Sequence, residues 1–131
     1  MPHFTVEYST NLEPAVNIDE LVSVVHQAAL DSGVFPLKGT RTRAAPRSVY
    51  EIADGHADNA FVHITAMIGE GRTIAVRQQA GELIYEAACE YLRDYFDDHP
   101  LAISFVMQEI EADTSFKFNN LPEWIERRKT Q

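Results

Sequence analysis

The same order of elements occurs twice along this chain, and this repeat restricts the fold more than any other feature of the sequence. Each half contains a strand-like segment, a segment with the apolar spacing of a helix, and a second strand-like segment. A strand, a helix and a strand in succession form a parallel, right-handed unit. The sequence therefore predicts two β-α-β halves, about residues 2–45 and 60–111, within a single domain of residues 1–131 that ends in a C-terminal tail over residues 112–131.

Local signals mark the ends of these elements. The first helix begins after Asn17, which can cap it, and ends at Gly33, while Thr73 can cap a second helix that reaches about Phe96. Pro46 ends the second strand. The predicted strands cover residues 2–8, 39–45, 60–68 and 101–111. The predicted buried stripe of the second helix consists of Val76, Ala80, Leu83, Ile84, Ala87, Ala88, Tyr91, Leu92 and Tyr95.

With both helices on one face, a four-stranded sheet would leave its other face uncovered. Four side chains assigned to that face are too apolar for a fully solvated sheet: Phe61, Met67, Phe105 and Val106. The tail adds large apolar groups for which the chain offers no evident internal partner, including Phe116, Phe118 and Trp124. Packing of sheets from several subunits would cover these groups, so the sequence predicts an oligomer.

Charge and composition exclude several classes of protein. The chain has 131 residues, with 11 lysines and arginines against 20 acidic residues and a formal net charge of −9, which argues against nucleic-acid binding. No apolar run approaches the ~20 residues that cross a membrane, and no signal peptide is evident, so we expect a cytoplasmic protein. Cys89 is the single cysteine, which excludes an internal disulfide, and we expect it in the core.

Pro2 is a candidate catalytic base. If Met1 is removed, Pro2 becomes the amino terminus and its nitrogen becomes a secondary amine. Terminal amines titrate near pH ~7.7–8.0, and burial or a neighbouring cation lowers that pKa. An unprotonated amine held on a strand is suited to proton transfer at neutral pH.

Arginines near the same end of the sheet are candidates for binding an anion. Arg41 and Arg43 alternate along the second strand, so both project from one face, and Arg41 lies near Pro2 because the two strands of a parallel unit begin at one edge. Arg72 precedes the second helix, whose N-terminus favours anions. An acidic protein that binds a carboxylate needs such a local cluster of cations.

No metal or cofactor site is predicted. His56 lies between Asp54 and Asp58, but no zinc-ligand spacing accompanies it. His3 and His63 fall in the middle of strands and are expected to be ordinary sheet residues.

Several ordered blocks of sequence resemble one known family. The start, Met-Pro-His-Phe-x-Val-Glu, is similar to that of the 5-carboxymethyl-2-hydroxymuconate delta-isomerases of the tautomerase superfamily. The resemblance continues to about residue 120, through the blocks at residues 33–43, 53–55, 60–63, 69–72, 77–82 and 116–120.

This resemblance implies a tautomerase-like tandem β-α-β fold with a mixed sheet, a homotrimer and no cofactor. It implies that Pro2 is the acid/base and that Arg41 and Arg72 bind a small-molecule polycarboxylate, and we add Arg43 as a further substrate-binding candidate. The implied reaction converts a 2-hydroxy-dienoate into its 2-oxo-enoate isomer during homoprotocatechuate (4-hydroxyphenylacetate) breakdown. Short tautomerases carry an arginine soon after the first strand, where this chain has Asn11 and Leu12, which shifts anion binding to Arg72.

Two alternatives remain at this point. A catalytically silent trimeric module that binds the same ligands would share the fold, because a fold does not determine a function. A decarboxylase or hydratase of the tautomerase type would use the same proline.

Overall fold

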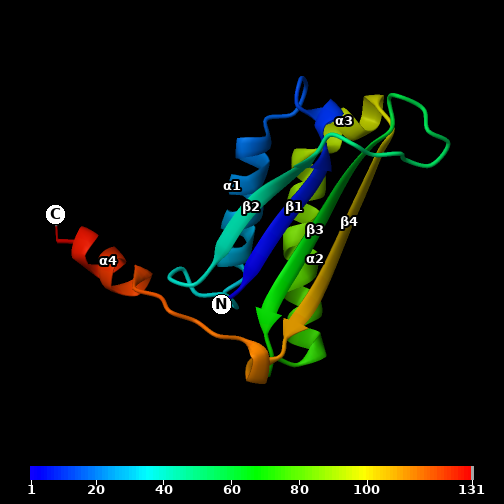
Figure 1. Ribbon diagram of the computed structural model, residues 1–131. Coiled ribbons are helices and arrows are strands. Elements are labelled where there is room, and N and C mark those ends of the chain that lie inside the picture. The colour runs from blue at the N-terminus through cyan, green and yellow to red at the C-terminus, as the bar shows by residue number, and fades with distance from the viewer. Residues whose placement is uncertain (131) are drawn as a thin grey trace.

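A computed structural model describes residues 1–130 and contains the predicted four-stranded mixed sheet with two long helices on one face (Figure 1). The sheet order is β2-β1-β3-β4, in which β1 pairs with β2 and β3 with β4 in parallel, while β1 and β3 are antiparallel. The two β-α-β units are therefore joined through their first strands. The strands are β1 (His3–Ser9), β2 (Arg41–Arg47), β3 (Ala60–Gly69) and β4 (Leu101–Ile110).

Both predicted helix caps form. The Asn17 side chain accepts a hydrogen bond from the Glu20 amide at 3.1 Å, and Thr73 accepts one from the Val76 amide at 3.2 Å. The helices are α1 (Ile18–Asp31), α2 (Ile74–Tyr91), α3 (Arg93–Asp98) and α4 (Leu121–Arg128), and the short 3₁₀ helices are η1 (Thr10–Leu12) and η2 (Ala112–Thr114).

The predicted continuous helix to Phe96 is wrong. The chain leaves the helical conformation at Leu92 (φ −88°, ψ 0°), and α3 begins one residue later. The Leu92 side chain is 1 % exposed, so burial of this residue in the core accompanies the break. The second strand also differs from its prediction, because it continues through Pro46. β2 lies at an edge of the sheet and has a neighbouring strand on one side only, so the missing N–H of proline is tolerated there.

The core lies between the sheet and α1 and α2. Alternate residues of the central strands, including Phe4, Val6, Val62 and Ile64, are 0 % exposed and face the helices. Part of the predicted stripe on α2 is wrong, because Val76 and Leu83 are 37 % and 42 % exposed. Cys89 is half-buried instead of a core residue.

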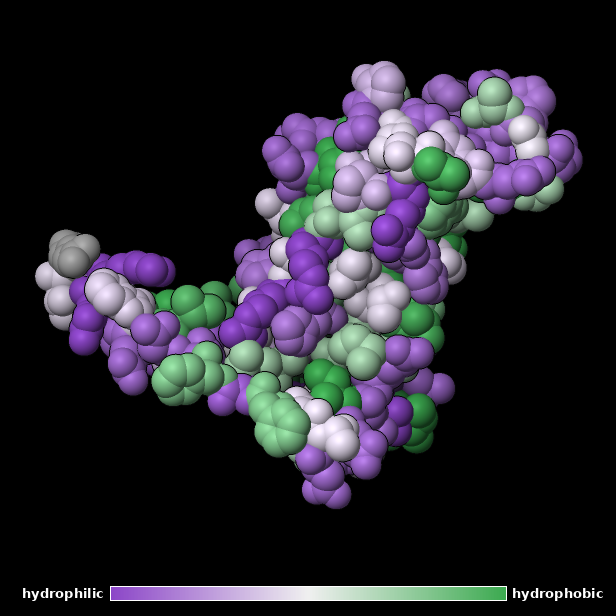
Figure 2. Space-filling model, in the orientation of Figure 1, coloured by the Kyte–Doolittle hydropathy of each residue, from purple (hydrophilic) through white to green (hydrophobic). Residues whose placement is uncertain are grey.

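The opposite face of the sheet carries Phe61, Met67 and Val106, as predicted. Figure 2 looks onto the molecule in the orientation of Figure 1, and apolar residues lie among hydrophilic ones across its surface. Phe105 was assigned to this face wrongly. It pairs in register with the buried Ile64, and a Cβ added to Gly81 of α2 would lie 3.2 Å from its ring, so Phe105 packs on the helix side.

The C-terminal tail crosses the end of the sheet. It follows β4, passes close to the N-terminus, and places α4 beyond β2 (Figure 1). An ion pair of 2.6 Å between Lys38, which precedes β2, and Glu126 of α4 agrees with this path. Within residues 1–130, no helix combines the length and apolar character that crossing a membrane requires.

Candidate active site

The first strand begins in a closely packed corner of the protein. Pro2 is buried, and its carbonyl oxygen accepts a hydrogen bond of 3.1 Å from the Arg41 amide. Gly39 lies in the same corner, since a Cβ there would be in ordinary contact with Pro36 at 3.5 Å and with Pro2 at 3.8 Å. The parallel register pairs His3 with Arg41, which places Arg41 beside the start of β1 as the sequence predicts.

Arg72 is held by the backbone and by an aromatic ring. Its two terminal nitrogens donate hydrogen bonds of 3.1 Å to the Gly69 carbonyl and 3.2 Å to the Val34 carbonyl. Its guanidinium also lies 5.3 Å from the centroid of the Phe35 ring. The preceding residue, Gly71, has φ +116°, a conformation that favours glycine. The turn before α2 therefore fixes the position of this cation.

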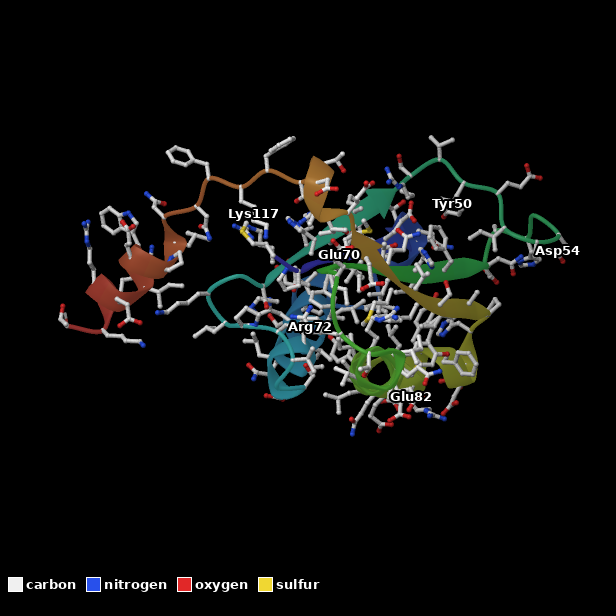
Figure 3. All side chains as sticks on the ribbon, turned by 90° about the horizontal axis from the view of Figure 1, so that it is seen from below. Tyr50, Asp54, Glu70, Arg72, Glu82 and Lys117 are labelled. Carbon is white, nitrogen blue, oxygen red and sulfur yellow. The ribbon has the colours of Figure 1, made fainter. Side chains whose placement is uncertain are left out.

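Lys117 joins the two arginines near the amino terminus. Burial first, and then the positive charges of Lys117, Arg41 and Arg72, lower the pKa of the Met1 amino group below its ordinary value of 8.0. Figure 3 shows Arg72 and Lys117 well away from Asp54, which lies at the far end of the molecule. The tail also contacts Met1, whose sulfur lies 3.7 Å from the Asn119 side-chain nitrogen.

Lys117 was absent from the predicted site residues. The block at residues 116–120 matched the family resemblance, but its sequence position, far from Pro2 and both arginines, gave no reason to place it at the site. Only the path of the tail across the end of the sheet brings it there.

Arg43 lies farther along the open face and is exposed. Its guanidinium nitrogen is 3.0 Å from His3 Nδ1. Burial, then the charges of Arg43 and Arg41, lower the pKa of His3, so this imidazole is neutral at pH 7 and can accept the hydrogen bond. Arg43 thus lies beside the other cations, and its guanidinium is hydrogen-bonded to His3 on the neighbouring strand.

Arg77 of α2 contacts the turn that carries Arg72. It is half-buried, lies 3.7 Å from a carboxylate oxygen of Glu109, and donates a 3.3 Å hydrogen bond to the Arg72 carbonyl. Arg77 therefore supports the turn that carries Arg72, and it is unsuitable as a control for substitutions at the site.

The residues that replace the early arginine of short tautomerases have structural roles. The Asn11 side chain donates hydrogen bonds to the carbonyls of Asn59 (2.8 Å) and Ala57 (3.3 Å), and so holds the connection between β2 and β3. Leu12 is 0 % exposed. Within the described residues 1–130, no group of three or more histidine, cysteine, aspartate or glutamate side chains is arranged to hold a metal ion.

The geometry therefore defines a cluster of cations around the start of a buried strand, on an acidic protein. Comparison with known proteins gives this cluster its context. Residues 2–125 match the sequence profile of the family described as 5-carboxymethyl-2-hydroxymuconate isomerase. The 5-carboxymethyl-2-hydroxymuconate Delta-isomerase of Escherichia coli is 37 % identical over 121 residues, which cover 92 % of this chain and 96 % of that protein.

Solved structures agree with these sequence matches. A 5-carboxymethyl-2-hydroxymuconate isomerase from Deinococcus radiodurans R1 superimposes with a TM-score of 0.86 at 31 % identity, covering 95 % of this chain and 93 % of the other. A fused 4-OT described as a wild-type symmetric trimer has a TM-score of 0.68 at 18 % identity, with 90 % and 92 % coverage, and so shares the fold.

The fold and its relatives define an isomerase of the tautomerase type. The chain belongs to the 5-carboxymethyl-2-hydroxymuconate isomerase family. This assignment favours the isomerase over the silent binding module and over the decarboxylase or hydratase.

Proposed function

We propose that this protein converts 5-carboxymethyl-2-hydroxymuconate into its 2-oxo-enoate isomer without a cofactor, with the amine of Pro2 as acid and base. The observation that carries the proposal is the cluster of Arg41, Arg72 and Lys117 near the amino terminus, where burial and these charges lower the pKa of the Met1 amino group. Removal of Met1 is part of the proposal, because with Met1 attached the Pro2 nitrogen is an amide without useful basicity.

The proton shift balances within the substrate. The Pro2 nitrogen takes the proton of the 2-hydroxyl group, the oxygen becomes a carbonyl, and the electrons of the diene move along the carbon chain. The ammonium of Pro2 then returns the proton to the carbon at the far end of the diene. One amine can perform both steps when its pKa lies near the working pH.

The charge of the substrate matches the cations around the site. The name 5-carboxymethyl-2-hydroxymuconate implies three carboxylates, two from the muconate and one from the carboxymethyl group. Arg41, Arg72 and Lys117 supply three positive charges on a protein whose formal net charge is −9. In this proposal they bind the carboxylates and stabilise the negative oxygen that forms as Pro2 removes the proton. Arg43 lies two residues after Arg41 on β2 and adds a further positive charge beside these three cations.

The open face of the sheet supports a homotrimer as the working assembly. Phe61, Met67 and Val106 lie on that face, and apolar side chains on an uncovered sheet face favour packing against another subunit. We place the reaction in the breakdown of aromatic compounds, at the homoprotocatechuate (4-hydroxyphenylacetate) step that the family resemblance implies.

An ultraviolet assay tests the proposal. The purified protein, shown by intact mass to begin at Pro2, should deplete the dienol absorbance of 5-carboxymethyl-2-hydroxymuconate. It should act more slowly on 2-hydroxymuconate, which lacks the third carboxylate. Arg93→Ala is the matched control, because Arg93 is an exposed arginine at the start of α3, at the far end of the sheet. No turnover of either dienol by the Pro2-terminated chain would contradict the proposed reaction.

A further inference from the structure

The turn that carries Arg72 and the tail that carries Lys117 leave the sheet side by side. β3 and β4 are parallel and stay in register to their last residues, where Gly69 pairs with Ile110 (Figure 1). Arg72 follows Gly69 within the turn before α2, and Lys117 follows Ile110 within the tail. Two of the cations in the candidate site therefore depend on how these neighbouring segments are held against each other.

The backbone of the turn before α2 is held from outside the turn. Gly71 has φ +116°, and a glycine loses more conformational freedom on folding than any other residue. Contacts with other parts of the chain therefore contribute to keeping Arg72 in one place. One of them comes from the tail, because the Glu70 side chain accepts a hydrogen bond of 3.4 Å from the Ala112 amide.

Arg77 makes a second connection, between the backbone of this turn and β4. Its Nε donates a hydrogen bond of 3.3 Å to the Arg72 carbonyl, and its Nη1 lies 3.7 Å from a carboxylate oxygen of Glu109. The Arg77 amide donates to the Thr73 carbonyl at 3.1 Å, so the residue is fixed in the first turn of α2. Glu109 pairs in register with the buried Ile68, which places it on the helix side of β4. One side chain thus joins the end of β4 to the residue that carries the site cation.

The charge of Arg77 is already opposed within the protein. The Glu109 carboxylate lies beside one end of its guanidinium, its Nε is bonded to a carbonyl, and only 26 % of the side chain is exposed. Within residues 1–130, by contrast, Arg72 forms no ion pair. Arg72 is therefore the cation available to a bound carboxylate, and Arg77 is suited to hold it in position.

We infer that Arg77 and Glu109 are positioning residues for the reaction: Glu109 orients the Arg77 guanidinium, and Arg77 holds the Arg72 carbonyl. The pair thereby fixes Arg72 relative to the end of β4, from which the segment with Lys117 departs. Neither residue of the pair touches substrate in this arrangement. The inference rests on the proposed function, because that proposal assigns Arg72 to the substrate. An ion pair that only ties α2 to β4 would contribute to stability alone, and the experiments below separate the two roles.

A double-mutant cycle tests whether Arg77 acts through Arg72. Arg77→Met keeps the aliphatic part of the side chain and removes its donors, and Gln79→Met, at an exposed residue of α2, is the matched control. We expect Arg77→Met to lower kcat/KM about tenfold, through the same parameter, kcat or KM, that Arg72→Ala changes. In a chain that already carries Arg72→Ala, Arg77→Met should change kcat/KM by less than about twofold, because no Arg72 side chain remains to be positioned. An equal loss in both backgrounds, or equal kcat/KM in Arg77→Met and Gln79→Met, would overturn the inference.

Glu109→Gln tests the same pair from β4, and it applies even where Arg77→Met does not fold. The amide keeps the size of the carboxylate and loses its charge, so kcat/KM should fall, but by less than in Arg77→Met. In the Arg72→Ala background the same substitution should have no effect, since Glu109 acts only through Arg77 and Arg72. Urea unfolding would show which variants are folded. A Glu109→Gln loss that persists in full without the Arg72 side chain, or no loss at all, would refute the role of Glu109.

A measurement without turnover keeps this inference separate from the proposed reaction. In protein made with isotopically labelled arginine, the nuclear magnetic resonance signal of the Arg72 Nε–H group is identified by its absence in Arg72→Ala. We expect this signal to move in Arg77→Met and Glu109→Gln and to stay in place in Gln79→Met. No turnover of the dienol by the Pro2-terminated wild type would contradict the proposed function alone. An Arg72 signal that is unchanged in Arg77→Met would overturn the positioning role.

Discussion

Replacing Arg72 by alanine should lower kcat/KM by about 10- to 150-fold, because a charge-assisted hydrogen bond contributes roughly 1.5–3 kcal/mol and each ~1.4 kcal/mol is a factor of ten. The magnitude follows from the donors that Arg72 has available. A guanidinium has five N–H groups. Two of them bond to the Gly69 and Val34 carbonyls, which leaves one on each nitrogen for a carboxylate or the developing oxyanion. A bidentate contact therefore remains possible while the backbone bonds fix the side chain.

Arg72→Lys separates charge from geometry. The lysine keeps one positive charge but loses the planar fork that reaches both carbonyls and substrate, so its kcat/KM should lie between those of wild type and Arg72→Ala. Steady-state kinetics on the three proteins and on Arg93→Ala would measure this order, and urea unfolding would show that each variant remains folded. A folded Arg72→Ala variant with kcat/KM within about twofold of Arg93→Ala would refute the assigned role of Arg72.

Three further predictions concern the amino terminus and the helix pair. The kcat/KM should rise with pH through the pKa of the Pro2 amine, because activity requires the unprotonated amine, and the cations that lower the pKa of the Met1 amino group would also disfavour the ammonium of Pro2; a kcat/KM that does not rise with pH would argue against it. Lys117→Gln should move this rise to higher pH, because the amine loses a neighbouring cation, and should raise KM, because the substrate carboxylates lose one as well. A rise that does not move would show that Lys117 does not act on the amine. Tyr91→Phe should lower the free energy of unfolding by about 1 kcal/mol at pH 7, because the hydroxyl donates a 2.7 Å hydrogen bond to Glu20. Burial first, and then Glu20, raise the Tyr91 pKa to about 12, so wild-type stability falls as pH rises from 10 to 12, and urea unfolding should show a smaller fall in the variant.

The periodicity of the sequence was sufficient to predict the order of the elements, because alternating and helical apolar patterns are local, whereas the mixed sheet was implied by the family resemblance. It failed where tertiary packing decides the outcome. Leu92 is a good helix former, and nothing in the local sequence signals the break between α2 and α3. Phe105 and Val106 are adjacent, so they must point to opposite faces of β4, and only the register with β3 shows which one faces the helices.

Likewise, the sequence was sufficient to place some residues of the candidate site but not others. Arg41 could be placed near Pro2 because a parallel unit begins both strands at one edge, and Arg72 because it opens a helix. Lys117 could not be placed, since an extended tail without regular pairing has no periodicity that predicts its path. The support that Arg77 gives to the Arg72 carbonyl depends on a single side-chain conformation, which the helical spacing does not reveal.

The central claim is that a free Pro2 amine performs the proton transfer, and blocking that amine tests it most directly. Two preparations would be compared by intact mass and by kcat/KM for 5-carboxymethyl-2-hydroxymuconate: one that begins at Pro2, and one in which an additional residue remains attached to Pro2. Circular dichroism would show that both are folded. We predict a loss of about 100-fold or more in the extended chain, because its Pro2 nitrogen is an amide and cannot act as a base. Equal kcat/KM in the two preparations would contradict the account.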